Sequence, residues 1–103
     1  MNAADVFHAL GDPVRLAMVQ RLARQEPCTI ADVCEGSGIT RQGARKHLQV
    51  LVDAHLVVLE PHGREVQVQL DRRGLDEARA LLDRIGRQWD RRLEALKRSL
   101  EGE

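Results

Sequence analysis

The sequence predicts a mainly α fold with one β-hairpin, on the basis of three successive patterns. Two short helical segments flank a glycine turn in residues 29–56, and apolar residues then alternate over residues 57–70. Helical spacing returns over residues 72–100. With 103 residues the chain has the size of one small domain. We therefore expect a single winged helix-turn-helix domain over residues 1–103, with five helices, a wing at 57–70 and a dimerisation helix at 72–100.

The composition argues against a polycationic nucleic-acid binder, a membrane protein and a disulfide-rich protein. Sixteen basic residues balance sixteen acidic ones, so any nucleic-acid binding must come from a local patch and not from overall charge. No apolar run approaches the roughly 18 residues of a membrane helix, and the first residues do not resemble a secretion signal. Two cysteines are too few for a disulfide framework. We expect a cytoplasmic protein that does not enter a membrane.

Helix starts are marked clearly before the hairpin. A short first helix should stop at Gly11, and Asp12-Pro13 has the pattern of an N-cap followed by a first helical residue. Thr29 and Asp32 have the spacing of a capping box, which places the start of a third helix at Thr29. Thr40 can cap a fourth helix after the glycine turn, and we expect Cys34 to fill the helix crossing.

The fourth helix has the charge of a DNA-recognition helix. It lacks acidic residues from Thr40 to Val52 and has three formal positive charges. Arg and Gln pair with guanine and adenine edges, whereas Lys and hydroxyl groups usually meet phosphates. The alternative is an ordinary solvated helix face. We expect base contacts from Arg41, Gln42 and Arg45, and phosphate contacts from Thr40, Lys46 and Gln49.

The hairpin should end in a turn at Pro61-His62-Gly63-Arg64. At the tip of a wing, Arg64 would reach an adjacent DNA groove or backbone. A solvated β-turn is the competing interpretation for His62.

The last helix has a narrow apolar seam with heptad-like spacing. A helix over 75–100 is about 39 Å long, roughly the diameter of a globule of this size, so one small core cannot cover it. Self-association would cover the seam, which consists of Leu75, Ala78, Leu82, Ile85, Trp89, Leu93, Leu96 and Leu100.

Neither an enzyme site nor a metal site is indicated, and we expect no cofactor. Cys28 and Cys34 are six residues apart and lack the paired spacing of zinc ligands. The chain has neither a glycine-rich phosphate loop nor a nucleophile elbow. Two alternatives stay open beside DNA binding alone: a redox-responsive regulator that uses Cys28 near a helix start, and a winged-helix module that binds protein.

These motifs resemble the ArsR family of bacterial winged helix-turn-helix repressors. The resemblance is carried by Leu-Gly-Asp-Pro-Val-Arg-Leu at 10–16, Lys-His-Leu-Gln-Val-Leu at 46–51, Leu-Val at 56–57 and the hairpin after it. It implies a homodimer joined through the first helix, with Phe7, and the last helix. It also implies binding to double-stranded operator DNA near the regulator's own gene, with repression relieved by a signal.

The departures from the family pattern concern metal sensing. Metal-sensing members have Cys-x-Cys on the third helix, where this chain has Thr29 and Ala31. Other members place His ligands on the last helix, which contains no His here. The chain therefore resembles a subgroup without the usual metal-binding cysteines, responding to an unknown small-molecule or thiol signal.

Overall fold

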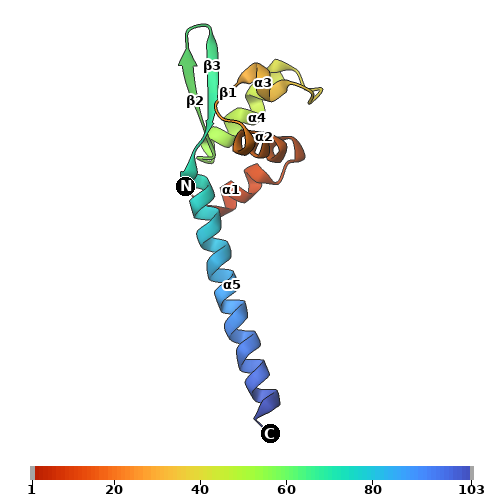
Figure 1. Ribbon diagram of the computed structural model, residues 1–103, viewed down its shortest axis with the longest axis vertical. Helices are drawn as coiled ribbons and strands as arrows, with labels where there is room; N and C mark the ends of the chain where they lie inside the picture. The colour runs from red at the N-terminus through yellow and green to blue at the C-terminus, as the bar shows by residue number, and fades with distance from the viewer. Residues whose placement is uncertain (1, 103) are drawn as a thin grey trace.

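The computed structural model describes residues 2–102, which form five helices and a three-stranded antiparallel sheet (Figure 1). This architecture confirms the winged helix-turn-helix prediction. No helix in the described part of the chain is both long and apolar enough to cross a membrane. The elements are α1 (Ala3–Leu10), α2 (Pro13–Arg24), β1 (Cys28–Thr29), α3 (Ile30–Cys34), α4 (Arg41–Asp53), β2 (Val57–His62), β3 (Glu65–Leu70) and α5 (Arg72–Glu101).

The junction of α1 and α2 explains the Asp-Pro-x-Arg sequence. The Asp12 carboxylate accepts hydrogen bonds from the backbone N–H groups of Val14 (2.8 Å) and Arg15 (3.1 Å), so it caps α2 as predicted. Arg15 Nε donates to the carbonyl of Ala9 at 2.7 Å, and Arg15 Nη2 donates to the carbonyl of His8 at 3.3 Å. Arg15 thus binds two backbone carbonyls at the C-terminal end of α1, while Asp12 caps the N-terminal end of α2.

The helix-turn-helix begins and turns where the sequence predicts. Thr29 and Asp32 form a reciprocal capping box, with both hydrogen bonds at 3.0 Å. Gly36 and Gly38 have φ of 75° and 72°, in the left-handed region that glycine adopts without strain. The Thr40 hydroxyl accepts from the N–H of Gly43 at 3.0 Å and caps α4.

The core lies where α1, α2, α4 and the sheet meet. Its largest fully buried side chains come from several elements, so the helices and the sheet are held together by packing against one another. They are Val6, Leu22, Cys28, Leu48, Leu51, Leu56, Val57 and Val68.

The sheet differs from the predicted hairpin in two ways. A short strand, β1, pairs antiparallel with β3, so that Cys28 lies opposite Val68. The turn is also shorter than the four residues expected, because His62 still pairs with Glu65 and only Gly63 and Arg64 remain between the strands. Gly63 has φ of 63°, as a tight hairpin turn requires.

The two cysteines differ in burial, and Cys34 is less buried than predicted. Cys28 is 1% exposed because β1 places it against the core, whereas Cys34 ends α3 and is only partly buried. The prediction for Cys34 is therefore confirmed only in part, because the residue packs against the core but is not fully buried. Both thiols are free.

Helix α5 leaves the rest of the fold and projects away from it, at the opposite end from the β2–β3 wing (Figure 1). The molecule measures 70 × 24 × 21 Å and has a radius of gyration of 18.6 Å, whereas a compact chain of this length has about 13 Å. Because α5 projects beyond the core, the predicted seam has a buried part and an exposed part. Ala78 and part of Leu75 pack against the protomer's own core, and the seam is exposed from Leu82 onward.

Gly74, in the first turn of α5, lies against the end of the segment that follows α4. Its N–H donates to the carbonyl of His55 at 2.8 Å, and a Cβ atom there would lie 2.6 Å from that same oxygen. Alanine favours a helix by about 0.8–1 kcal/mol over glycine, but the backbone of His55 cannot move aside cheaply. We expect Gly74→Ala to lower the free energy of unfolding by at least about 1 kcal/mol. Urea unfolding at matched protein concentration measures this change, and a more stable variant would contradict the close approach.

Asp71 caps α5, and we expect the protein to lose stability in acid when its carboxylate is protonated. It is 8% exposed, and its carboxylate binds the Arg73 guanidinium at 2.7 Å and the Arg73 N–H at 3.0 Å. The Arg73 side chain, followed by its backbone N–H, lowers the pKa of Asp71. Because the folded-state pKa is lowered, the stabilisation is present above the ordinary pKa of about 4 and is lost as pH falls through the folded value.

The test of this charge effect uses Asp71→Asn, because asparagine still caps a helix. We expect the variant to be less stable than the wild type at pH 7 and the difference to vanish at acid pH. Chemical unfolding at a series of pH values measures both proteins. A difference that stays constant into acid would show that charge plays no part.

Candidate nucleic-acid interface

Helix α4 separates its buried and exposed sides sharply. Ala44, Leu48 and Leu51 are fully buried, and this inner row fixes the helix against the core. The predicted contact residues all lie on the exposed side, free of the core: Thr40, Arg41, Gln42, Arg45, Lys46 and Gln49. Gln49 is partly engaged, because its Nε2 donates to the Asp53 carboxylate at 2.9 Å.

The structure brings the predicted helix and wing residues together. Arg41 and Arg45 from α4 line the same hollow as Arg64 from the turn of the wing, a space of about 90 Å³ closed by the start of α3. Glu65 is the acidic residue that lines it. Three arginines and one glutamate line this hollow, so its formal charge is positive in a chain of zero net charge.

The wing stands beside the helix-turn-helix (Figure 1). Arg64 is exposed at its tip, as expected. His62 lies next to the tip, and its Nε2 is 3.7 Å from a carboxylate oxygen of Glu60 on the same strand. His62 is exposed but is the last residue of β2, so the structure places it in the strand beside the turn and not in the turn itself.

A contact that the sequence did not suggest joins α4 to the α1–α2 junction. Arg15 Nη1 lies 3.3 Å from His47 Nδ1, on the flank of α4. Arg15 therefore joins α1, α2 and α4 through one side chain. A motif around residues 10–16 could be recognised in sequence, but its partner 32 residues away could not.

The surroundings of Cys28 do not favour a reactive thiol. Reactive cysteines are accessible and lie in positive surroundings. Cys28 is 1% exposed, and its Sγ donates to the carbonyl of Gln25 at 2.8 Å. Within residues 2–102, no three His, Cys, Asp or Glu side chains gather closely enough to hold a metal ion.

Comparison with known proteins identifies the family. A family model described as a helix-turn-helix domain matches residues 10–60. An ArsR-like transcriptional regulator from Rhodococcus sp. RHA1 is 33% identical, with a TM-score of 0.78 over 93% of this chain and 90% of the other. The chain belongs to the ArsR family. ArsR-family proteins are transcriptional regulators that bind DNA, so this chain is a DNA-binding regulator and not an enzyme.

Two further solved structures resemble this ArsR-family chain. A possible transcriptional regulator for arsenical resistance is 31% identical, with a TM-score of 0.72 over 79% of this chain and 83% of the other. Another ArsR-family transcriptional regulator is 24% identical, with a TM-score of 0.78 over 84% and 89%. Comparison with curated proteins gives no match.

Proposed function

We propose that this ArsR-family protein is a cytoplasmic, homodimeric repressor that reads its operator with α4 and the wing. One observation carries the proposal: Arg41, Arg45 and Arg64 converge on one hollow from two separate elements. Three exposed arginines that line one hollow do not contribute to the core, so their placement indicates a binding surface. DNA, with its phosphate backbone and groove edges, is the partner that this chemistry fits.

Within the interface we assign two roles. Arg41, Gln42 and Arg45 lie near the start of α4, the part of a recognition helix that reaches base edges in the major groove. Their side chains suit guanine and adenine edges. The phosphate contacts fall to groups that position the helix without reading sequence, namely Thr40, Lys46, Gln49 and, from the wing, Arg64.

We infer the homodimer from the uncovered face of α5. Six large apolar side chains on this helix are 46–73% exposed, and Phe7 on α1 is 37% exposed. Monomers rarely leave an apolar surface of this length in water. Covering the six half-exposed side chains yields on the order of 5–9 kcal/mol per protomer before entropy is lost. These residues are Leu82, Ile85, Trp89, Leu93, Leu96 and Leu100, with Leu75 at the inner end of the seam.

We propose that the regulatory signal is not a metal ion bound at the positions that metal-sensing family members use. Thr29, which stands at one Cys position, caps α3 through its hydroxyl, and Ala31 at the other has no metal-binding group. Helix α5 contains no His. The repressor role itself rests on the resemblance to ArsR repressors.

Salt dependence tests DNA binding through phosphates. With about 4–5 phosphate contacts per chain, a dimer releases enough counterions to give a log–log slope of about −7 to −9. Fluorescence anisotropy with one labelled operator duplex at several salt concentrations measures this slope. A slope near zero would contradict the phosphate assignments.

A further inference from the structure

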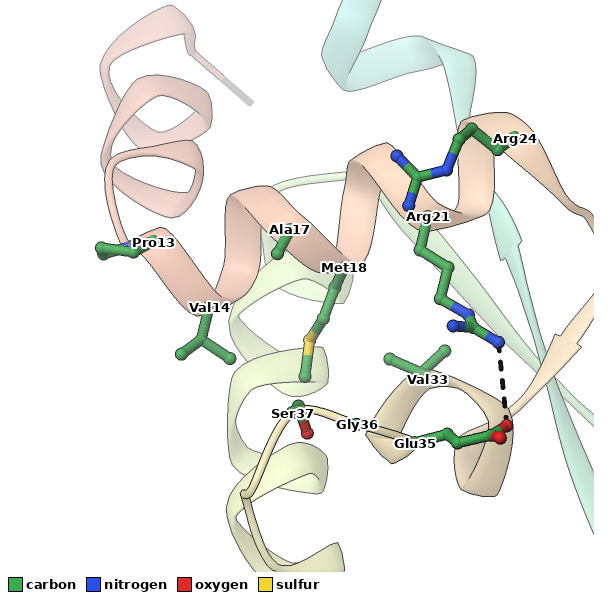
Figure 2. A pocket seen from close by; sticks show the side chains of 10 residues that line it. All are labelled: Pro13, Val14, Ala17, Met18, Arg21, Arg24, Val33, Glu35, Gly36 and Ser37. Carbon is green, nitrogen blue, oxygen red and sulfur yellow. Dashed lines mark ion pairs between the residues drawn. The ribbon is translucent and has the colours of Figure 1, made fainter.

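A pocket of about 340 Å³ lies between α2 and the segment that joins α3 to α4 (Figure 2). It shares no lining residue with the hollow formed by Arg41, Arg45 and Arg64. One wall is a face of α2. The other wall is the end of α3 together with residues 35–37, which form the turn of the helix-turn-helix. The pocket therefore borders the turn that sets the position of α4.

The lining of the pocket is part apolar and part cationic. Val14, Ala17, Met18 and Val33 supply the apolar part, and Arg21 extends from α2 toward Glu35, while the Arg24 guanidinium lies apart from that of Arg21 (Figure 2). Val14 and Arg21 are seven residues apart on one helix, which corresponds to about 10 Å along its axis. An amphipathic anion of that length matches both ends at once. The cations are Arg21 and Arg24.

Arg21 has unused hydrogen-bonding capacity at this site. Its Nε is buried and finds no hydrogen-bond partner within residues 2–102, while the side chain as a whole is 32% exposed. Its one ion pair, Nη2 to Glu35, spans 4.0 Å, and the Glu35 side chain is 76% exposed (Figure 2). A buried donor without a partner is uncommon in folded proteins, so Nε is free to bind an acceptor that a ligand brings. A carboxylate can accept two parallel bonds from such a guanidinium.

We propose that this pocket binds a medium-chain fatty carboxylate of about eight carbons. Its carboxylate replaces Glu35 on Arg21, and its chain lies along Val14, Ala17 and Met18. Glu35 is free to turn into water because most of its surface is already exposed. An alcohol head group lacks the negative charge that pairs with a guanidinium, and an ammonium head group is repelled by the two arginines that line the pocket.

The site gives the proposed repressor a signal input, and this part of the inference rests on the proposed function. A ligand wedged between α2 and Gly36-Ser37 pushes on the turn that precedes α4. If two positions of α4 exist, the ligand favours the position in which the pocket binds it more tightly. We expect occupancy to lower operator affinity by at least tenfold.

The binding test uses octanoate and the full chain without DNA. Isothermal titration gives the affinity, and the ¹³C-methyl resonance of Met18 reports the location, because Met1 is the only other methionine. We expect one octanoate per chain, a shifted Met18 signal, and much weaker binding of 1-octanol and octylamine. Arg21→Gln should weaken octanoate binding at least tenfold, Ala17→Phe should fill the pocket and abolish it, and Glu35→Gln should strengthen it.

The matched control is Arg79→Gln, which removes an exposed arginine of α5 outside this pocket and should leave octanoate affinity unchanged. Octanoate held by the apolar face of α5 would be insensitive to Arg21→Gln and Ala17→Phe. That result overturns the proposal, as does equal affinity for octanoate and 1-octanol. Circular dichroism verifies that each variant is folded.

The regulatory step is tested separately by adding octanoate to a protein–operator complex. A chain that binds octanoate but no operator contradicts the proposed repressor function and leaves the pocket assignment standing. A chain that binds operator but no octanoate overturns the pocket and leaves the repressor standing. A complex unaffected by saturating octanoate overturns the signal input.

Discussion

We expect Trp89→Glu to separate the proposed dimer into single chains of 11.6 kDa and to lower operator affinity by roughly 10²–10⁴-fold. Trp89 is 59% exposed in the middle of the uncovered α5 face. A glutamate there would be buried without a partner in the dimer, which is costly for a charge. Each single chain keeps its own α4 and wing but loses the second half-site of the operator.

Sedimentation velocity and DNA titration of the same samples measure both effects. Ala80→Glu is the matched control, because it adds the same charge to an exposed position on the opposite side of the same helix. We expect this control to stay dimeric and to bind operator like the wild type. A dimeric Trp89→Glu protein, or a wild type that is already monomeric at micromolar concentration, would contradict the assignment of α5 as the dimer seam.

Arg45→Ala should cost about 1–3 kcal/mol of operator affinity and relax specificity at one base position. Arg45 is exposed on α4 and borders the hollow shared with the wing. A bidentate arginine contact to guanine gives discrimination of this size. Titration against the operator and against single-base variants measures both the loss and its dependence on sequence.

The outcome separates two roles for Arg45. An equal loss on every duplex, with a shallower salt slope, would make Arg45 a phosphate contact and not a base contact. Arg79→Ala removes an exposed arginine outside the interface and should change affinity little. A comparable loss from this control would show that overall charge, and not α4, governs binding.

Local signals in the sequence were sufficient for most helix boundaries. The caps at Asp12, Thr29 and Thr40 each bind backbone groups two or three residues away, so the residues that define the motif also satisfy it. Gly38 is required by the backbone of the turn itself. The family resemblance then supplied the arrangement of these elements.

Features that depend on distant partners could not be predicted in this way. Strand β1 has two residues, too few for alternation, and exists only because β3 lies beside it. That pairing also decides that Cys28, and not Cys34, is the buried thiol. The contact of Arg15 with His47 joins residues 32 positions apart.

The sequence was sufficient to name the candidate contact residues on α4. It was not sufficient to place them relative to the wing. An acid-free stretch with three cations indicates a recognition helix from the sequence alone. That Arg64 lies with Arg41 and Arg45 depends on the length and register of the wing. The pocket beneath Arg21 requires α2 and the α3–α4 turn to meet, and no local pattern encodes it.

A fluorescence anisotropy titration tests the central claim most directly. One duplex holds the DNA upstream of the protein's own gene and the other its scrambled sequence, both at about 0.15 M salt. Sequence-specific repression by α4 and the wing predicts tight binding to the native duplex and at least roughly 10³-fold weaker binding to the scrambled one. Equal, weak binding to both duplexes would contradict it.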